Sequence, residues 1–187
     1  MLDQHLRTSA TNIFAAGDVT GGPQFTHYAG WQCFQAVRNA LLPGSAKGTS
    51  DVIPAVTFID PEIAHVGLSE ADARAKLGDE VRVHQWEMAH ADRPVCDGEP
   101  EGFVKVVTRG KGVIVGATMV ASRAGEMIQE LALAVQRKLT LSDVAATMHA
   151  YPTWSMAVQQ LASEVAVADF LGGTTGKLAL DLARWVR

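Results

Sequence analysis

The sequence predicts an α+β fold, in which helices cover one face of an antiparallel sheet. Short strand-like segments come first and longer helical patterns follow, the order typical of this class. The clearest local signal is Arg109-Gly110-Lys111-Gly112, which separates two strand-like runs and predicts a hairpin turn. The expected strands of this sheet are residues 55–58, 63–66, 81–88, 103–108 and 113–120.

Helices are indicated by apolar residues at helical spacing and by capping signals. Ser69 is followed three residues later by Asp72, and Thr140 by Asp143, and each pair predicts the start of a helix. The helix expected at 123–138 has a broad apolar face, made of Met127, Ile128, Leu131, Leu133, Ala134 and Val135. The other expected helices are residues 27–42, 69–78, a short one after 140, 153–170 and 177–186.

The first segment reads as a strand, a glycine-rich loop and a helix. The apolar run Asn12–Ala16 precedes Gly17-Asp18, which predicts a buried strand that ends in a tight turn. One strand and one helix cannot bury both faces of that strand, so we expect a packing partner or a chain that is a fragment. The predicted divisions are residues 1–44, a linker at 45–51, a domain at 52–171 and a C-terminal tail helix at 172–187.

Composition excludes several classes of protein. The 187 residues are 48% hydrophobic, enough for a core and too many for a disordered chain. Sixteen basic and twenty acidic residues give a net charge of −4, which argues against a nucleic-acid partner. No apolar run reaches the roughly 18 residues of a membrane span, and the N-terminus lacks signal-peptide features. We therefore expect a cytoplasmic protein with no membrane partner.

The two cysteines are too few for a disulfide framework or a zinc site, and no metal site is predicted. Cys96 lies in a Pro/Gly-rich segment that reads as an exposed loop. Cys33 is expected to be a small buried thiol, without a redox role, on an apolar helical stripe. That stripe consists of Ala29, Cys33, Ala36, Val37, Ala40 and Leu41.

Four stretches together carry a resemblance to a known family. They are residues 11–19 (TNIFAAGDV), 54–70 (PAVTFIDPEIAHVGLSE), 124–128 (AGEMI) and 149–153 (HAYPT). In this order they resemble the C-terminal part of the FAD-dependent pyridine nucleotide-disulfide oxidoreductases, which include glutathione reductase, lipoamide dehydrogenase and mercuric reductase. The resemblance extends to about Gly173.

The resemblance implies the end of an FAD-binding domain followed by a dimerisation domain, with a homodimer formed through residues 52–171. The parent enzyme would pass electrons from NAD(P)H to FAD and on to a disulfide or related acceptor. A G-x-G-x-x-G fingerprint and a C-x4-C redox pair are absent from the sequence, so the chain alone is expected to be inactive and not to retain FAD. The alternatives are a non-catalytic homodimerisation module and part of a mercuric-reductase-like metal-ion reductase.

The resemblance also assigns flavin contacts in the first segment. Asp18, after Gly17, would accept hydrogen bonds from ribityl hydroxyls of the flavin. Thr26 and His27 would open the helix whose N-terminus faces the pyrimidine end of the flavin, where the helix dipole stabilises negative charge.

The catalytic expectation depends on a departure from the family pattern. Thiol-handling members carry a histidine directly before Pro-Thr and a glutamate five residues after it, where this chain has Tyr151 and Met156. With a reference pKa of about 10, tyrosine is a poor base near neutral pH, which argues against lipoamide or glutathione as the substrate. A tyrosine here suits a hydrogen-bond donor or a weak ligand. His149, two residues earlier, is either a replacement base or a structural histidine.

Overall fold

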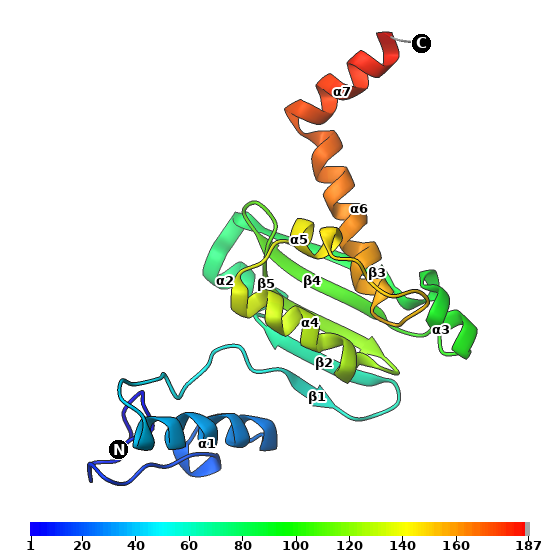
Figure 1. Cartoon of the computed structure of the whole chain (residues 1–187). Helices are drawn as coiled ribbons and strands as arrows, with labels where there is room; N and C mark the ends of the chain where they lie inside the picture. The colour runs from blue at the N-terminus through cyan, green and yellow to red at the C-terminus, as the bar shows by residue number, and fades with distance from the viewer. Residues whose placement is uncertain (186–187) are drawn as a thin grey trace. The chain divides into compact units, whose positions relative to one another are not determined.

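The computed structural model describes residues 1–185 and divides into two compact units, Met1–Ile53 and a second that begins at Pro54. The second unit contains an antiparallel five-stranded sheet in the order β1-β2-β5-β4-β3 (Figure 1). This sheet with its helices confirms the predicted α+β class. The strands are β1 (Ala55–Thr57), β2 (Glu62–Gly67), β3 (Val81–Glu87), β4 (Phe103–Arg109) and β5 (Val113–Ala121).

The sheet is centred on β4 and β5, which form the predicted hairpin. Arg109 pairs with Val113 around the glycine-containing turn. Farther along the hairpin, Val104 pairs with Met119 and Val106 with Ala117. These four cross-strand side chains are fully buried, so the centre of the core lies on the face of the sheet that they share.

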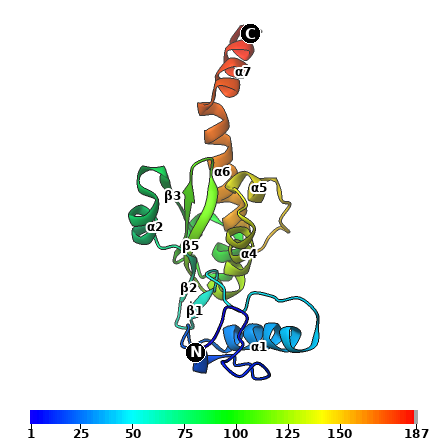
Figure 2. The same cartoon turned by 90° about the vertical axis from the view of Figure 1, so that its left-hand side faces the viewer.

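Two long helices cover that face. The helix α4 (Ala124–Arg137) packs on β2 and β5, and α6 (Met156–Gly172) packs on β3 and β4 (Figure 2). The short α5 (Leu141–Ala146) packs on α6. The prediction placed helices on one face of the sheet, but α2 (Glu70–Leu77) packs on the other face. Its Ala73 forms a small core there with Val81 and Val107.

The capping signals placed their helix starts correctly. The Ser69 hydroxyl accepts a hydrogen bond from the backbone N–H of Asp72 and begins α2. Thr140 and Asp143 form a reciprocal capping box at α5. The apolar face predicted for α4 was too wide: Leu131 is fully buried, but Leu133 points to solvent. Both leucines fit the apolar pattern of the sequence. They differ in burial because Leu131 faces the sheet and Leu133 faces away from it.

The remaining short elements differ from the sequence prediction at two places. The segment around Cys96 is a six-residue helix, α3 (Asp92–Asp97), rather than a loop. The last helix, α7 (Thr174–Trp185), begins three residues before the predicted start at 177. Two 3₁₀ turns, η2 (Gly78–Glu80) and η3 (Met88–His90), flank β3. Within residues 1–185, no helix has both the length and the apolar character needed to cross a membrane.

The first unit contains the 3₁₀ turn η1 (Asp18–Thr20) and the helix α1 (Thr26–Leu41). The strand predicted at Asn12–Ala16 is wrong: the segment makes only an isolated bridge between Arg7 and Phe14. A strand needs neighbouring strands to satisfy its backbone groups, and the first unit, as described, supplies none.

The apolar stripe predicted for α1 is also wrong, except at Ala36. The buried residues of α1 are Tyr28, Gln32, Ala36 and Asn39, whereas Cys33 is exposed. The Gln32 side chain accepts from the Gly17 N–H and donates to the Gly48 carbonyl, and Asn39 donates to the carbonyls of residues 5 and 46. These amides face inward because they satisfy backbone groups of irregular segments. Two of the four buried residues of α1 are thus amides that hydrogen-bond to backbone groups.

Candidate functional site

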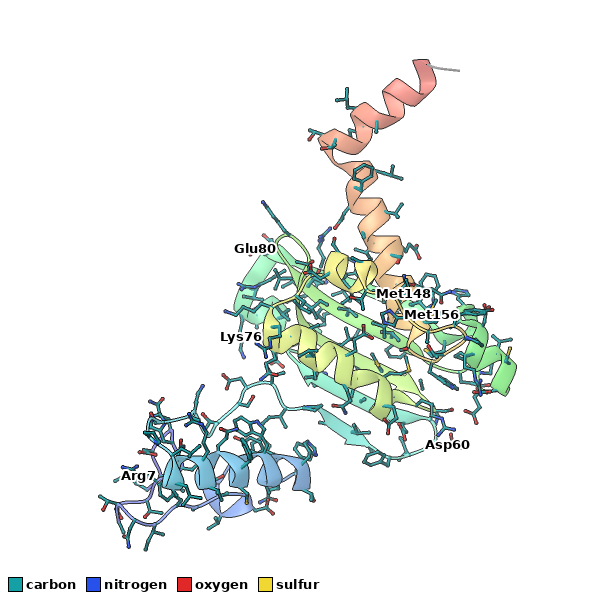
Figure 3. The ribbon with its side chains drawn as sticks, in the orientation of Figure 1. Arg7, Asp60, Lys76, Glu80, Met148 and Met156 are labelled. Carbon is teal, nitrogen blue, oxygen red and sulfur yellow. The ribbon has the colours of Figure 1, made fainter. Side chains whose placement is uncertain are left out.

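The candidate site in the second unit is the segment of residues 147–155, which joins α5 to α6. It carries both His149 and Tyr151, the two catalytic candidates from the sequence. Figure 3 labels Met148 and Met156, near the two ends of this segment. The loop leaves much of its surface exposed, so polar contacts are important for its conformation.

His149 is held between two hydrogen-bond acceptors. Its Nδ1 lies 3.0 Å from the carbonyl oxygen of Thr147, and its Nε2 lies 2.9 and 3.0 Å from the carboxylate oxygens of Glu130 on α4. The His149 side chain is only 6% exposed. A neutral imidazole carries one N–H, so it can donate to only one of these partners unless Glu130 holds a proton. Both ring nitrogens of His149 therefore face hydrogen-bond acceptors.

Glu130 was missed by sequence reasoning. The family pattern places the carboxylate five residues after position 151, where this chain has Met156. The carboxylate comes instead from α4, 19 residues before His149. The one sequence signal is an acidic residue directly beside the apolar stripe of α4, and such residues are usually solvated.

Tyr151 is 70% exposed, and its hydroxyl donates a hydrogen bond to Oδ2 of Asp92 at 2.8 Å. This bond and the charge of Asp92 raise the pKa of Tyr151 above its ordinary value. Tyr151 is thus an even poorer base than a free tyrosine, and its proton is directed toward Asp92. Asp92 was also missed, because it precedes Tyr151 by 59 residues in a segment read as loop.

A second contact joins α3 to the same loop. The Trp154 indole N–H donates to Oδ2 of Asp97 at 3.0 Å, and Nε of Arg93 lies 2.8 Å from the same oxygen. Hydrogen bonds from Arg93 and Trp154 and the charges of Arg93 and Arg123 hold the pKa of Asp97 below its usual range. A cavity of about 480 Å³ opens beside this cluster. Its lining includes Arg93, Asp97, Arg123, Glu126, Thr153 and Trp154.

The two sequence candidates do not form one hydrogen-bonded unit. His149 is bound to Glu130 of α4, and Tyr151 is bound to Asp92 of α3. The loop therefore presents a partly buried histidine–carboxylate pair and, separately, an exposed phenol. Within the described residues, no group of three or more His, Cys, Asp or Glu side chains could hold a metal ion.

The flavin candidates lie in the first unit. Gly17 has φ +80°, a conformation that favours glycine, and its N–H donates to Gln32 at 2.8 Å. The exposed Asp18 follows and begins η1. Thr26 and His27 are the first two residues of α1, whose N-cap, Phe25, has no side-chain acceptor to cap the helix. The first turn of α1 carries the positive end of the helix dipole.

Comparison with known proteins identifies the class. Residues 53–162 match the family model described as the dimerisation domain of pyridine nucleotide-disulphide oxidoreductases. The chain belongs to this family, as its sequence motifs predicted.

Two curated relatives, a dihydrolipoyl dehydrogenase and a mercuric reductase, are similar to most of the chain. Dihydrolipoyl dehydrogenase from Geobacillus stearothermophilus is 38% identical over 168 residues, which cover 89% of this chain and 35% of the relative. Mercuric reductase from Bacillus cereus is 38% identical over 154 residues, covering 82% of this chain and 24% of the relative. The chain thus spans about a third or less of the curated relatives it matches.

Solved structures show the same relationship. LpdA from Mycobacterium tuberculosis superposes with a TM-score of 0.81 and 32% identity, over 88% of this chain and 36% of that one. The HOCl-induced flavoprotein disulfide reductase RclA from Escherichia coli superposes with a TM-score of 0.79 and 28% identity, over 87% of this chain and 38% of that one.

Proposed function

We propose that this chain is the dimer-forming part of an FAD-dependent NAD(P)H oxidoreductase and that residues 52–171 bind a second copy of the chain. The parent enzyme would carry electrons from NAD(P)H through FAD to a disulfide or related acceptor. The match to a dimerisation domain and the flavoprotein disulfide reductase among the similar structures support this proposal.

The observation that carries the dimer proposal is the division of α6 into a covered and an uncovered half. The first half buries Ala157, Val158, Leu161 and Ala162 in the core. The second half leaves large apolar side chains in water, with Val167 57% exposed and Phe170 54% exposed. Each square ångström of apolar surface removed from water is worth about 25 cal/mol, so a two-fold partner that covers this half would gain stability.

The first unit fits its proposed role in a flavin site. A carboxylate that is exposed at Asp18 can accept hydrogen bonds from sugar-like hydroxyls. Thr26 and His27 begin α1, and the helix dipole favours negative charge near its N-terminus. When bound, the flavin would supply the electron transfer, and these residues would bind and orient it. The first unit would therefore provide one part of the flavin site.

The roles of the loop residues follow from their partners. His149, paired with Glu130, can hold a proton at Nε2, and we propose it as the acid–base group of this loop. Tyr151 is a poor base, because a tyrosine titrates at about pH 10 and Asp92 raises its pKa further. Its exposed position suits contact with the acceptor, with the phenol oxygen as the contacting atom. A substrate that needs the usual histidine at position 151 is therefore disfavoured.

Sedimentation equilibrium of the purified chain tests the dimer. We expect a mass of twice 19.9 kDa at micromolar concentration. Phe170→Glu places a charge on the uncovered half of α6 and is expected to weaken the dimer at least tenfold. The control is Lys76→Glu on α2, also an exposed charge substitution, which is expected to leave the dimer unchanged. A monomer at all concentrations, or equal effects of both substitutions, would refute the proposal.

Flavin titration separates the enzyme-derived role from a plain homodimerisation module. A dimer that also quenches added FAD fluorescence, and loses this effect in Asp18→Asn, supports a retained flavin contact. A dimer that gives no such signal is a dimerisation module on its own, and the flavin part of the proposal then fails while the dimer stands.

A further inference from the structure

The helix α3 contacts the 147–155 loop through two carboxylates. Asp92 accepts from the Tyr151 hydroxyl at 2.8 Å, and Asp97 accepts from the Trp154 indole at 3.0 Å. Tyr151 is 70% exposed, so apolar packing alone does not hold its ring. The orientation of its hydroxyl is therefore set largely by Asp92.

Asp92 comes from an anchored part of the chain. Met88 and Ala91, which precede it, are fully buried, and Pro94, which follows it, is also buried. The Met88 N–H donates to the carbonyl of Gly102 at 2.9 Å, which joins η3 to the chain leading into β4. The Asp92 carboxylate is thus carried by a segment whose neighbouring residues are buried, which limits its movement.

The loop has a second anchor on its other side. His149 is buried and bound to Glu130 of α4. Tyr151 therefore lies in the sequence between His149, which is bound to α4, and Trp154, which is bound to α3. Two anchors at this spacing limit the positions that the Tyr151 oxygen can occupy.

We propose that Asp92 is the positioning residue for Tyr151: it accepts the hydrogen bond of the phenol and so orients the hydroxyl. The inference rests on the proposed function, in which Tyr151 meets the electron acceptor. Because the phenol proton is directed to Asp92, the group left for the acceptor is an oxygen lone pair. The site therefore favours an acceptor that brings a hydrogen-bond donor or a cation to this oxygen, and it disfavours an anionic group.

The proposal has a direct spectroscopic consequence. Ionisation of Tyr151 beside Asp92 would place two negative charges at hydrogen-bond distance, which raises the pKa of Tyr151. The other titratable group that acts on Tyr151 is the Cys96 thiol, also on α3, with a smaller effect in the same direction. The sequence has only two tyrosines, Tyr28 and Tyr151. In a Tyr28→Phe background, the ultraviolet absorbance of tyrosinate thus reports on Tyr151 alone.

The test is an alkaline titration of the Tyr28→Phe chain with and without Asp92→Asn. We expect Asp92→Asn to lower the tyrosinate midpoint clearly. The matched control is Asp97→Asn, which removes a carboxylate from the same helix but one bound to Trp154 and Arg93, and it is expected to leave the midpoint unchanged. Circular dichroism at each pH restricts the comparison to the folded chain.

A tyrosinate midpoint that does not change on Asp92→Asn substitution would overturn the proposal, as would an equal shift in Asp97→Asn. Asp92→Ser provides a second variant if the asparagine variant folds poorly, with the same expected direction. NMR provides a second measurement of the midpoint, with ¹³C at the tyrosine ring carbon that bears the hydroxyl. Its chemical shift is followed against pH for the resonance of the folded chain only. The tyrosine titration reports a contact within one chain and does not depend on dimer formation. A monomeric chain would therefore refute the proposed dimer, and the titration would still test the contact between Asp92 and Tyr151.

Discussion

Truncation of Leu131 to alanine measures how much of the stability comes from the contact between α4 and the sheet. Leu131 is fully buried on the face of α4 that packs on β2 and β5. Leu→Ala at such positions costs about 3 kcal/mol, from the lost transfer free energy and the cavity that remains. With a urea m-value of about 2 kcal/mol/M, this loss lowers the unfolding midpoint by about 1.5 M.

The chain contains a matched control two residues away. Leu133 lies on the same helix and is 54% exposed, so Leu133→Ala makes the same chemical change with the same helix propensity effect. We expect its free energy of unfolding to change by less than about 0.5 kcal/mol. The assay is urea unfolding, followed by circular dichroism at matched protein concentrations. Equal midpoints for the two variants would show that α4 does not pack as described, and the reasoning from burial would be wrong.

Two further predictions concern the capping box of α5. Thr140→Ala removes the side-chain acceptor for the Asp143 N–H and is expected to cost about 1 kcal/mol in urea unfolding, whereas a cost below about 0.3 kcal/mol would contradict the cap. Hydrogen bonds from the backbone N–H and hydroxyl of Thr140 lower the pKa of Asp143 from 3.8. A lowered folded-state pKa stabilises the protein above the unfolded value, and this contribution is lost as the pH falls through the folded value. The difference in urea midpoint between the wild type and Asp143→Asn is therefore expected to shrink as the pH falls from about 5 to about 2, and a difference independent of pH would refute the ionic contribution.

Local sequence signals predicted the parts of the fold that depend on neighbouring residues. The turn at 109–112 and the caps at Ser69 and Thr140 each act within a few residues, so their geometry is encoded by the short segment itself. The alternation of apolar and polar residues over 81–88 similarly predicted β3. The strand expected at Asn12–Ala16 failed for the opposite reason, because a strand is stable only where other strands pair with it.

The candidate site shows the same limit. The sequence identified His149 and Tyr151 through their motif, but neither partner carboxylate. Glu130 lies 19 residues from His149, and Asp92 lies 59 residues from Tyr151. Partners at such distances are chosen by how α4 and α3 pack beside the loop, and no local pattern reports that packing. The same holds for Gln32, whose burial follows from the backbone groups that it meets.

The five strands of the sheet, the long helices, the turn at 109–112, the caps and the family motifs were determined by the sequence alone, because each is a short-range or linear property of the chain. Only the tertiary structure decided that Leu131 is buried while Leu133 is not, and that the proton of Tyr151 points to Asp92. Burial and hydrogen-bond pairing depend on which surfaces meet in space, and those surfaces come from segments far apart in the chain.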